Sequence, residues 1–312
     1  YKRQYYEDVY KKEFTATVVE CREQKKGYAV ILDESAFYPE GGGQPSDVGT
    51  LGDAKVTEVH EKDGELLHYT DKALEVGAKV EGKIDWARRF DLMQQHSGEH
   101  MVSGIIHEKY GYDNVGFHMG SDVITVDLNG MLDDSQLAEI EREVNERVWE
   151  DREVVITYPD AEELKTIDYR SKKELTGQVR IVTFPGVDVC ACCGTHVTHT
   201  GEIGMVKLLS VVKFHDGIRM EMICGKRVLD YLNMVNEQNH QISMKLSATA
   251  FASFSMEVEP DMLTEPERSA YLSALSAAVS AASVASAAAV LTASTGVSAT
   301  VSAALALSLI HI

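Results

Sequence analysis

The sequence is short of positive charge. Its 312 residues include 30 Lys and Arg against 49 Asp and Glu, which gives a formal net charge of −19. Such a deficit argues against a protein that coats nucleic acid or an anionic membrane without specificity. It leaves room for a local basic path to one specific RNA. The N-terminal end also lacks a hydrophobic run of the kind found in secretory signals.

Cysteine is scarce, and its number is odd. Three of the five cysteines fall within positions 190–193, and the other two are Cys21 and Cys224. An odd, clustered set does not suit a framework of disulfides. We therefore predict free thiols in a reducing, cytoplasmic setting, with a thiolate or metal-binding role for the cluster.

The end of the sequence lacks charge altogether. The last charged residue is Arg268, and the 44 residues that follow include 15 Ala and 10 Ser. Serine dilutes this stretch too much for a good membrane span, so we expect no membrane partner. We predict that residues 261–312 form a low-complexity Ala/Ser tail that is disordered or artefactual.

Residues 1–90 have the pattern of a small β-barrel domain. Short, partly alternating runs are separated by Gly or Asp turn signals. Three consecutive glycines at 41–43 interrupt this pattern and predict a loop where the backbone can approach another group closely. The predicted strands are 14–21, 28–33, 55–61, 66–69 and 79–84.

Residues 91–225 mix helical and strand signals, which indicates an α+β domain. A helix is predicted from an N-cap at Asp91 to a stop at Gly111, and a second, amphipathic one over 136–151. We expect a helical linker over 226–260, with its helix at 227–246. Strands are predicted at 123–128, 154–158, 179–184 and 205–214.

Two histidines four residues apart lie on the first of these helices. His96 and His100 would share one helix face, where both imidazoles can reach one ion. The pair alone is a weak signal, because this spacing is common on surface helices. The zincin motif is excluded, since Glu99 precedes the second histidine and no Glu follows the first.

A second pair follows in the cysteine cluster. Cys192 and His196 are also four residues apart, with Gly194 between them to permit a tight turn. A thiolate and an imidazole at this spacing can chelate zinc. Two such pairs in one chain predict a metal site, and Cys and His ligands favour Zn²⁺.

These motifs together resemble the editing domain of alanyl-tRNA synthetase and its free-standing relatives, the AlaX trans-editing proteins. The resemblance is carried by His96-x-x-x-His100 and Cys192-x-x-x-His196. It is supported by the glycine-rich loop at 37–49, by residues 193–204 and by residues 219–227. It extends from about residue 5 to about residue 247.

The resemblance implies an N-terminal β-barrel domain beside a zinc-containing α+β editing domain, followed by a helix. It implies a zinc-dependent hydrolase that deacylates mischarged tRNA(Ala), chiefly Ser-tRNA(Ala) and secondarily Gly-tRNA(Ala). The partner would be the acceptor end of tRNA(Ala). The metal ligands would be His96, His100, Cys192 and His196.

Serine differs from alanine by one hydroxyl, so an editing site should hydrogen-bond that group. Candidates for this role are Ser35, where the family commonly has Thr, and Gln44 in the glycine-rich loop. His118 falls where synthetase editing domains often have Gln, and is expected to donate a hydrogen bond or carry a proton.

Basic side chains that could follow the acceptor stem are few. The run from Arg170 to Lys173 is our first choice, because it is the only local basic run in the acidic domain. The tRNA-binding candidates are Arg170, Lys172, Lys173 and Arg88.

Two other classes of protein fit part of the pattern. One is a non-catalytic zinc-binding module that interacts with RNA, in which the four ligands only hold a small fold together. The other is a zinc hydrolase of a small ester, which the acidic surface would suit. The glycine-rich loop with Gln44 favours an enzyme over a structural module.

Overall fold

A computed structural model describes residues 2–171 and 177–246. Residues up to Val228 form one compact unit, and α5 (Lys226–Leu246) continues from it into a second unit. The predicted tail at 261–312, residues 247–260 of the predicted linker, and Lys172 and Lys173 lie outside the described residues. The proposed domain boundaries at 90, 225 and 260 stay predictions.

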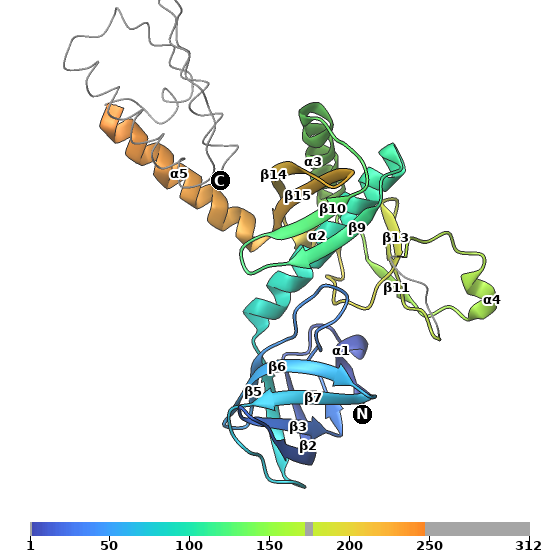
Figure 1. The fold of residues 1–312 in the computed structure, drawn as a ribbon, viewed down its shortest axis with the longest axis vertical. Helices are drawn as coiled ribbons and strands as arrows, with labels where there is room; N and C mark the ends of the chain where they lie inside the picture. Colours follow the sequence, from blue (N-terminus) through green and yellow to red (C-terminus); the bar gives the residue numbers. More distant parts are fainter. Residues whose placement is uncertain (1, 172–176, 247–312) are drawn as a thin grey trace, which may run out of the picture. The chain divides into compact units, whose positions relative to one another are not determined.

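The predicted small barrel is confirmed. Six antiparallel strands close it, in the order β2-β3-β7-β6-β5-β8 (Figure 1). Its core contains Phe14, Val30, Phe37, Leu51 and Val56, all nearly or fully buried. The strands are β2 (Glu13–Glu23), β3 (Tyr28–Leu32), β5 (Gly49–Leu51), β6 (Ala54–Lys62), β7 (Glu65–Thr70) and β8 (Lys79–Ile84).

A short segment precedes the barrel, and its strand pairs with another short strand that follows β3. β1 (Lys2–Arg3) lies parallel to β4 (Glu34–Ser35), and α1 (Gln4–Glu7) follows it. The glycine-rich loop runs from β4 to β5, two strands that the sequence did not predict.

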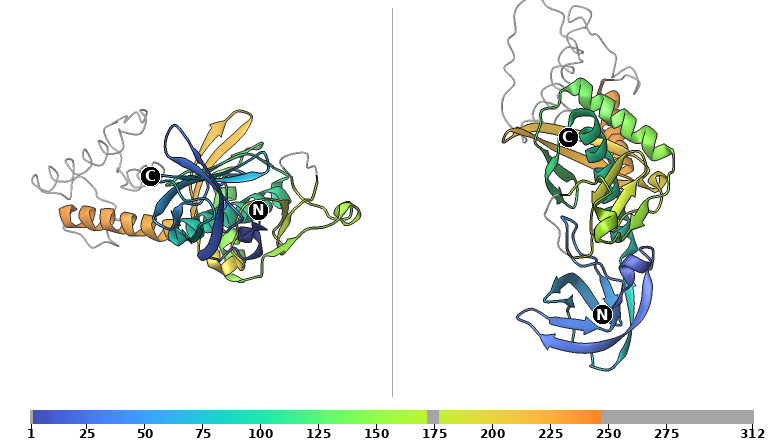
Figure 2. Two further views of the ribbon diagram at one scale, coloured as in Figure 1. Left: turned by 90° about the horizontal axis from the view of Figure 1, so that it is seen from below. Right: turned by 90° about the vertical axis from the view of Figure 1, so that its right-hand side faces the viewer.

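The α+β part is built on an antiparallel sheet in the order β14-β15-β10-β9. Helices α2 and α3 pack against this sheet and share its hydrophobic core (Figure 2). Asp133 caps α3 in a capping box with Gln136. The elements are α2 (Trp86–Tyr110), β9 (Asn114–Met119), β10 (Ile124–Leu128), α3 (Asp134–Trp149), β14 (Val206–Phe214) and β15 (Gly217–Cys224).

The predicted start of the first long helix was wrong. α2 begins at Trp86, with Asp85 as its N-cap, and ends at Gly111 in the left-handed conformation. Asp91 instead lies inside α2, where its carboxylate accepts hydrogen bonds from Arg227. Residues 92–106 of α2 are buried on every side. A helix with many buried polar side chains is therefore central to the unit.

A smaller three-stranded sheet completes the unit, in the order β11-β12-β13. Its strands are β11 (Val155–Thr157), β12 (Ile181–Phe184) and β13 (Asp188–Ala191), with α4 (Ala161–Leu164) between the first two and η1 (Thr200–Ile203) after the third. In the part of the chain that the structure describes, no helix is long and apolar enough to cross a membrane. All five cysteines are free, as predicted.

Candidate metal centre

Helix α2 supplies the first two side chains of the site. His96 and His100 lie one turn apart, and their rings stack with centroids 5.3 Å apart. Both are almost fully buried. Burial of two imidazoles in the middle of a helix needs polar partners, since a lone buried polar group is costly.

The segment after β13 supplies the other two. The Sγ of Cys192 lies 3.5 Å from Nε2 of His96 and 3.6 Å from Nε2 of His196. The ligand atoms of His96, His100, Cys192 and His196 all fall within 4.8 Å of one another. The structure therefore brings together all four residues that the sequence pairs singled out, and they could hold a metal ion.

The turn between Cys192 and His196 depends on glycine. A Cβ atom at Gly194 would lie 2.1 Å from Cε1 of His96 and 2.9 Å from Oε1 of Gln44. No side chain fits there without moving the histidine. Close approach of the backbone thus lets the segment from β13 reach α2.

Two of the imidazoles are oriented by hydrogen bonds at Nδ1. Oε1 of Gln44 lies 2.9 Å from Nδ1 of His96 and also accepts from the backbone N–H of Thr195 at 3.0 Å. Oδ2 of Asp188 lies 2.8 Å from Nδ1 of His100. These acceptors place the proton on Nδ1 of both rings and leave each Nε2 lone pair directed at the cluster.

The geometry suits a tetrahedral metal. Zinc–sulfur bonds of about 2.3 Å and zinc–nitrogen bonds of about 2.0–2.1 Å at tetrahedral angles hold sulfur and nitrogen about 3.5 Å apart, close to the two separations observed here. Nε2 of His100 is buried with no hydrogen-bond partner among the described residues. A buried lone pair without a donor is the group that a cation would satisfy.

Electrostatics favours the ligand forms of Cys192 and His196. Burial alone would raise the pKa of the Cys192 thiol, but the imidazoles of His96, His196 and His100 together hold it well below its usual range. Burial lowers the pKa of His196 to about 3, so this ring is neutral at pH 7. Burial would lower the pKa of His100, but the Cys192 thiolate and the hydrogen bond to Asp188 raise this pKa well above its usual range, so a bound cation would displace a proton from this ring.

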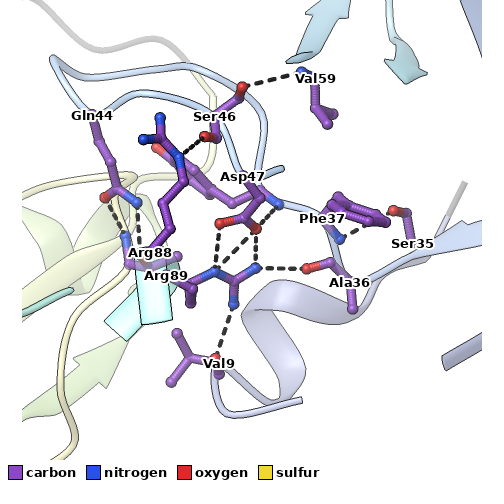
Figure 3. Close-up of polar contacts among 12 residues, drawn as sticks. Val9, Ser35, Ala36, Phe37, Gln44, Ser46, Asp47, Val59, Arg88 and Arg89 are labelled. Atoms are coloured by element: carbon purple, nitrogen blue, oxygen red, sulfur yellow. Dashed lines mark hydrogen bonds and ion pairs between the residues drawn. The ribbon is translucent and has the colours of Figure 1, made fainter. Parts of the chain in front are cut away.

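The glycine-rich loop is fixed to α2 by a buried ion pair. Asp47 accepts from Nε and Nη2 of Arg89, and both side chains are fully buried (Figure 3). Arg89 also donates to the carbonyls of Val9 and Ala36 at 2.9 and 2.7 Å. The loop that carries Gln44 is therefore held rigidly beside the helix that carries His96.

Ser35 lies inside the barrel. Its hydroxyl is 2.8 Å from Nε2 of His68 and accepts from the N–H of Phe37 at 3.2 Å. Because Nδ1 of His68 faces the carbonyl of Val30, that nitrogen carries the proton and the Ser35 hydroxyl donates to Nε2. The structure thus engages Ser35 in the barrel core and does not bring it into the cluster.

His118 is exposed on β9. The neighbouring Phe117 faces the site instead, with its ring centroid 5.4 Å from that of His96. Side chains alternate along a strand, so His118 points to the opposite face from Phe117. The structure therefore leaves His118 out of the group of converging ligand atoms. Its catalytic role stays a prediction.

The basic candidates are dispersed. Arg170 forms two hydrogen bonds of 2.8 Å to Asp188, so its guanidinium is already engaged. Arg88 is half-buried and donates to the carbonyl of Ser46 at 3.3 Å, on the glycine-rich loop (Figure 3). Lys172 and Lys173 lie outside the described residues.

Three residues of the site were missed in the sequence. Asp188 supports His100, Thr195 hydrogen-bonds both the oxygen and the nitrogen of the Gln44 carboxamide, and Phe117 packs on His96. Asp188 follows a turn and precedes the cysteine cluster by two residues, which is a weak signal in a chain rich in acids. Only the fold reveals its partner.

Comparison with known proteins gives the same relationships as the sequence motifs. The family model of the second additional domain of threonyl and alanyl tRNA synthetases matches residues 179–219, and that of class II (A) tRNA synthetases matches residues 3–88. The first of these matches includes Asp188, Cys192 and His196.

Curated relatives cover most of the chain. Alanyl-tRNA editing protein Aarsd1 of Bos taurus is 32% identical over 261 residues, which cover 77% of this chain and 57% of the relative. Alanyl-tRNA editing protein AlaX-L of Pyrococcus horikoshii is 35% identical over 243 residues, covering 75% and 60%. Alanine–tRNA ligase of Methanobrevibacter smithii is 35% identical over 251 residues, covering 75% and 28%.

The chain spans about three fifths of the length of the editing proteins that it matches. The matching parts include the barrel, the glycine-rich loop and the strands around the metal centre. On these motifs, models and relatives, the chain is similar to the alanyl-tRNA editing proteins over about three quarters of its length.

Proposed function

We propose that this protein is an aminoacyl-tRNA hydrolase that clears mischarged tRNA(Ala), chiefly Ser-tRNA(Ala) and secondarily Gly-tRNA(Ala). The observation that carries the proposal is the convergence of His96, His100, Cys192 and His196 beside the glycine-rich loop, in a chain related to alanyl-tRNA editing proteins. In the reaction, water adds to the ester carbonyl and the bond to the ribose oxygen breaks, releasing the amino acid.

Zn²⁺ is the proposed metal, held by His96, His100, Cys192 and His196. When bound, it supplies a fixed positive charge that positions the aminoacyl end. Four protein ligands are typical of a closed site, whereas catalytic zinc usually keeps one position open. We therefore assign the metal a positioning role, with the water activated partly by the hydroxyl of the substrate's own terminal ribose.

Gln44 is proposed to act on His96. Its carboxamide oxygen accepts hydrogen bonds from Nδ1–H of His96 and from the N–H of Thr195, and its nitrogen donates to Oγ1 of Thr195 at 2.7 Å. These contacts fix which way the amide faces, and so fix the His96 ring. They leave the carboxamide little freedom to turn toward a serine hydroxyl, so a positioning role suits Gln44 better than the recognition role first expected.

Selectivity follows from hydrogen bonding. A site that bonds the serine hydroxyl leaves its own polar groups unpaired when alanine enters, at a cost of roughly 1–3 kcal/mol for each group. The rings of Phe117 and Phe184 lie against His96 and His100, with centroids 5.4 Å apart in each pair. These apolar walls exclude loose water from the cluster.

The direct test is deacylation of Ser-tRNA(Ala), Gly-tRNA(Ala) and Ala-tRNA(Ala), each with and without a zinc chelator. We expect hydrolysis of the seryl ester, sparing of the alanyl ester, and loss of activity on chelation. The variant His100→Ala should lose zinc and activity together. Its matched control is His107→Ala, an exposed histidine on the same helix whose ring bonds Asp113.

Other outcomes separate the alternatives. Zinc binding with no hydrolysis of any ester would favour the non-catalytic zinc module. Hydrolysis of small aminoacyl esters but not of tRNA would favour the small-ester hydrolase. Activity that survives complete removal of zinc would remove the metal from the mechanism.

Arg88, Lys172 and Lys173 are the proposed contacts with the acceptor end of tRNA. Neutralising Lys172 and Lys173 together should lower the slope of tRNA affinity against salt concentration, because fewer counterions are released. An unchanged slope would place the path of the RNA elsewhere.

A further inference from the structure

A nearly buried ion pair stands directly behind one of the cluster histidines. Nε and Nη2 of Arg170 donate to the two oxygens of Asp188, each at 2.8 Å. The second of these oxygens also lies 2.8 Å from Nδ1 of His100. The Asp188 side chain is 1% exposed and that of Arg170 is 15% exposed. One carboxylate therefore links a guanidinium to an imidazole.

The backbone holds Arg170 in the same place as its side chain does. Its N–H donates to the carbonyl of Val189 at 2.8 Å, and its carbonyl accepts from Ala191 at 2.9 Å. These two bonds attach Arg170 to β13, the strand that begins with Asp188 and leads to Cys192. A residue whose side chain only contacts RNA at the surface does not need both these backbone bonds and the side-chain bonds to Asp188.

We propose that Asp188 and Arg170 are positioning residues that act through His100, and that Arg170 serves the metal centre and not the RNA. The inference rests on the zinc site of the proposed function. A carboxylate at Nδ1 fixes the tautomer and orientation of a histidine ligand and makes Nε2 a stronger donor. The guanidinium holds the buried carboxylate in one orientation through two hydrogen bonds.

The groups that orient His96 and His100 thus differ in charge. His96 is oriented by the neutral carboxamide of Gln44, whereas His100 is oriented by a paired carboxylate. An anionic acceptor forms a stronger hydrogen bond to an imidazole N–H than a neutral one does. We therefore assign His100 as the more firmly oriented of these two ligands.

A matched control is present elsewhere in the fold. Nε and Nη2 of Arg219 donate to the two oxygens of Asp127 at 2.6 and 2.8 Å, the same two-pronged arrangement. Within the described residues, no histidine nitrogen bonds to Asp127. The variant Asp127→Asn therefore disrupts a more exposed pair of the same geometry without touching a ligand of the cluster.

The experiment measures the Kd for zinc of the full chain by competition with a chromophoric chelator. The variants are Asp188→Asn, Arg170→Gln, the double variant and Asp127→Asn. Asparagine keeps the shape of Asp188 and an acceptor for His100, which protects folding. Thermal melts of the metal-free proteins check this, and Arg170→Lys serves as the conservative second variant.

We expect Asp188→Asn to raise the Kd about 10–100-fold. Arg170→Gln should raise it less, and Arg170→Lys less again, since Lys keeps the charge but loses the two-pronged contact. The double variant should match Asp188→Asn, because Arg170 acts through Asp188. Asp127→Asn should match the wild type. Arg170→Gln should also leave the salt slope of tRNA binding unchanged.

Four results would overturn the inference. A Kd for Asp188→Asn within threefold of the wild type would show that Asp188 does not position His100. If the fold-change in Kd of the double variant is the product of the two single fold-changes, Arg170 acts independently of Asp188. A salt slope lowered by Arg170→Gln makes Arg170 an RNA contact. Failure of the wild type itself to bind zinc would overturn the proposed metal site and this inference with it, and is seen before any variant is compared.

Discussion

Buried histidines occur in both the barrel and the α+β part, but their surroundings differ. His68 in the barrel is fully buried, and the protein satisfies both ring nitrogens through Val30 and Ser35. His100 is nearly as buried, yet its Nε2 has no partner among the described residues. Nε2 of His96 and of His196 instead face the sulfur of Cys192.

This difference separates a structural histidine from a ligand. A buried polar group is normally satisfied within the protein. Where buried imidazole nitrogens converge on one sulfur and one of them has no partner among the described residues, a cation could complete the set. The burial of a histidine alone therefore carries no functional information, whereas the partner of each nitrogen does.

The largest expected effect tests this contrast directly. His196→Ala should lower zinc affinity by more than about 100-fold, beyond the usual effect of changing a residue that only supports a ligand. His68→Gln should leave zinc affinity unchanged, although it alters an equally buried histidine. The measurement is zinc competition on both variants. Equal losses of affinity in the two would erase the distinction between the regions.

The second effect concerns the tie between the barrel and the metal centre. Arg89→Met removes one partner of a fully buried ion pair and leaves Asp47 as an unpaired buried charge. Unfolding in denaturant should show a loss of about 3–5 kcal/mol. The control is Arg22→Gln, which breaks exposed pairs with Glu20 and Glu65 and should change little. Similar small losses for both would show that the buried pair does not anchor the loop.

The third effect is a dependence on pH specific to the barrel. Burial lowers the pKa of His68 to about 4, against about 6.5 when unfolded. As the pH falls, the unfolded chain therefore binds a proton at His68 before the folded chain does. The stability from neutral His68 is complete above pH 6.5 and is lost as the pH falls toward 4, by about 3 kcal/mol. Metal-free protein should be compared with His68→Gln, and the gap in unfolding free energy should narrow over this range. A constant gap would contradict a neutral His68.

The smallest expected effect is at Gln44. Gln44→Met keeps the length of the side chain but removes the acceptor for His96 and Thr195. Zinc affinity should fall about tenfold, at the low end for a residue that supports a ligand, because a neutral acceptor is lost. Competition against the same chelator would measure it. A loss larger than that of Asp188→Asn would reverse the proposed ranking of the two supports.

Much of the architecture follows from local sequence signals. The barrel strands β2, β3, β6, β7 and β8 were predicted from alternation and turn residues. The start of α2 was misplaced because Trp86 to Phe90 contribute to packing against the rest of the unit, which the helical periodicity of the apolar residues does not reveal. The strands β5, β9, β13 and β15 were missed, although each pairs with a strand next to it in the sequence, because β-propensity is a weak local signal that depends on context.

The site was predictable only in part. Residues four apart in two segments marked His96, His100, Cys192 and His196 as a cluster. The partners that orient them come from distant positions: Gln44 lies 52 residues from His96, and Asp188 lies 88 residues from His100. The roles expected for Ser35 and Arg170 came from residue type and resemblance, and neither reveals that both side chains are already engaged.

The most direct test of the central claim is X-ray absorption at the zinc edge of the loaded protein. One sulfur at about 2.3 Å and three nitrogens at about 2.0–2.1 Å are predicted, from Cys192 and the three histidines. The sulfur signal should disappear in Cys192→Ser and persist in Cys193→Ser, its exposed neighbour. Two or more sulfurs, or a shell unchanged by Cys192→Ser, would contradict the assignment of these four residues to one ion.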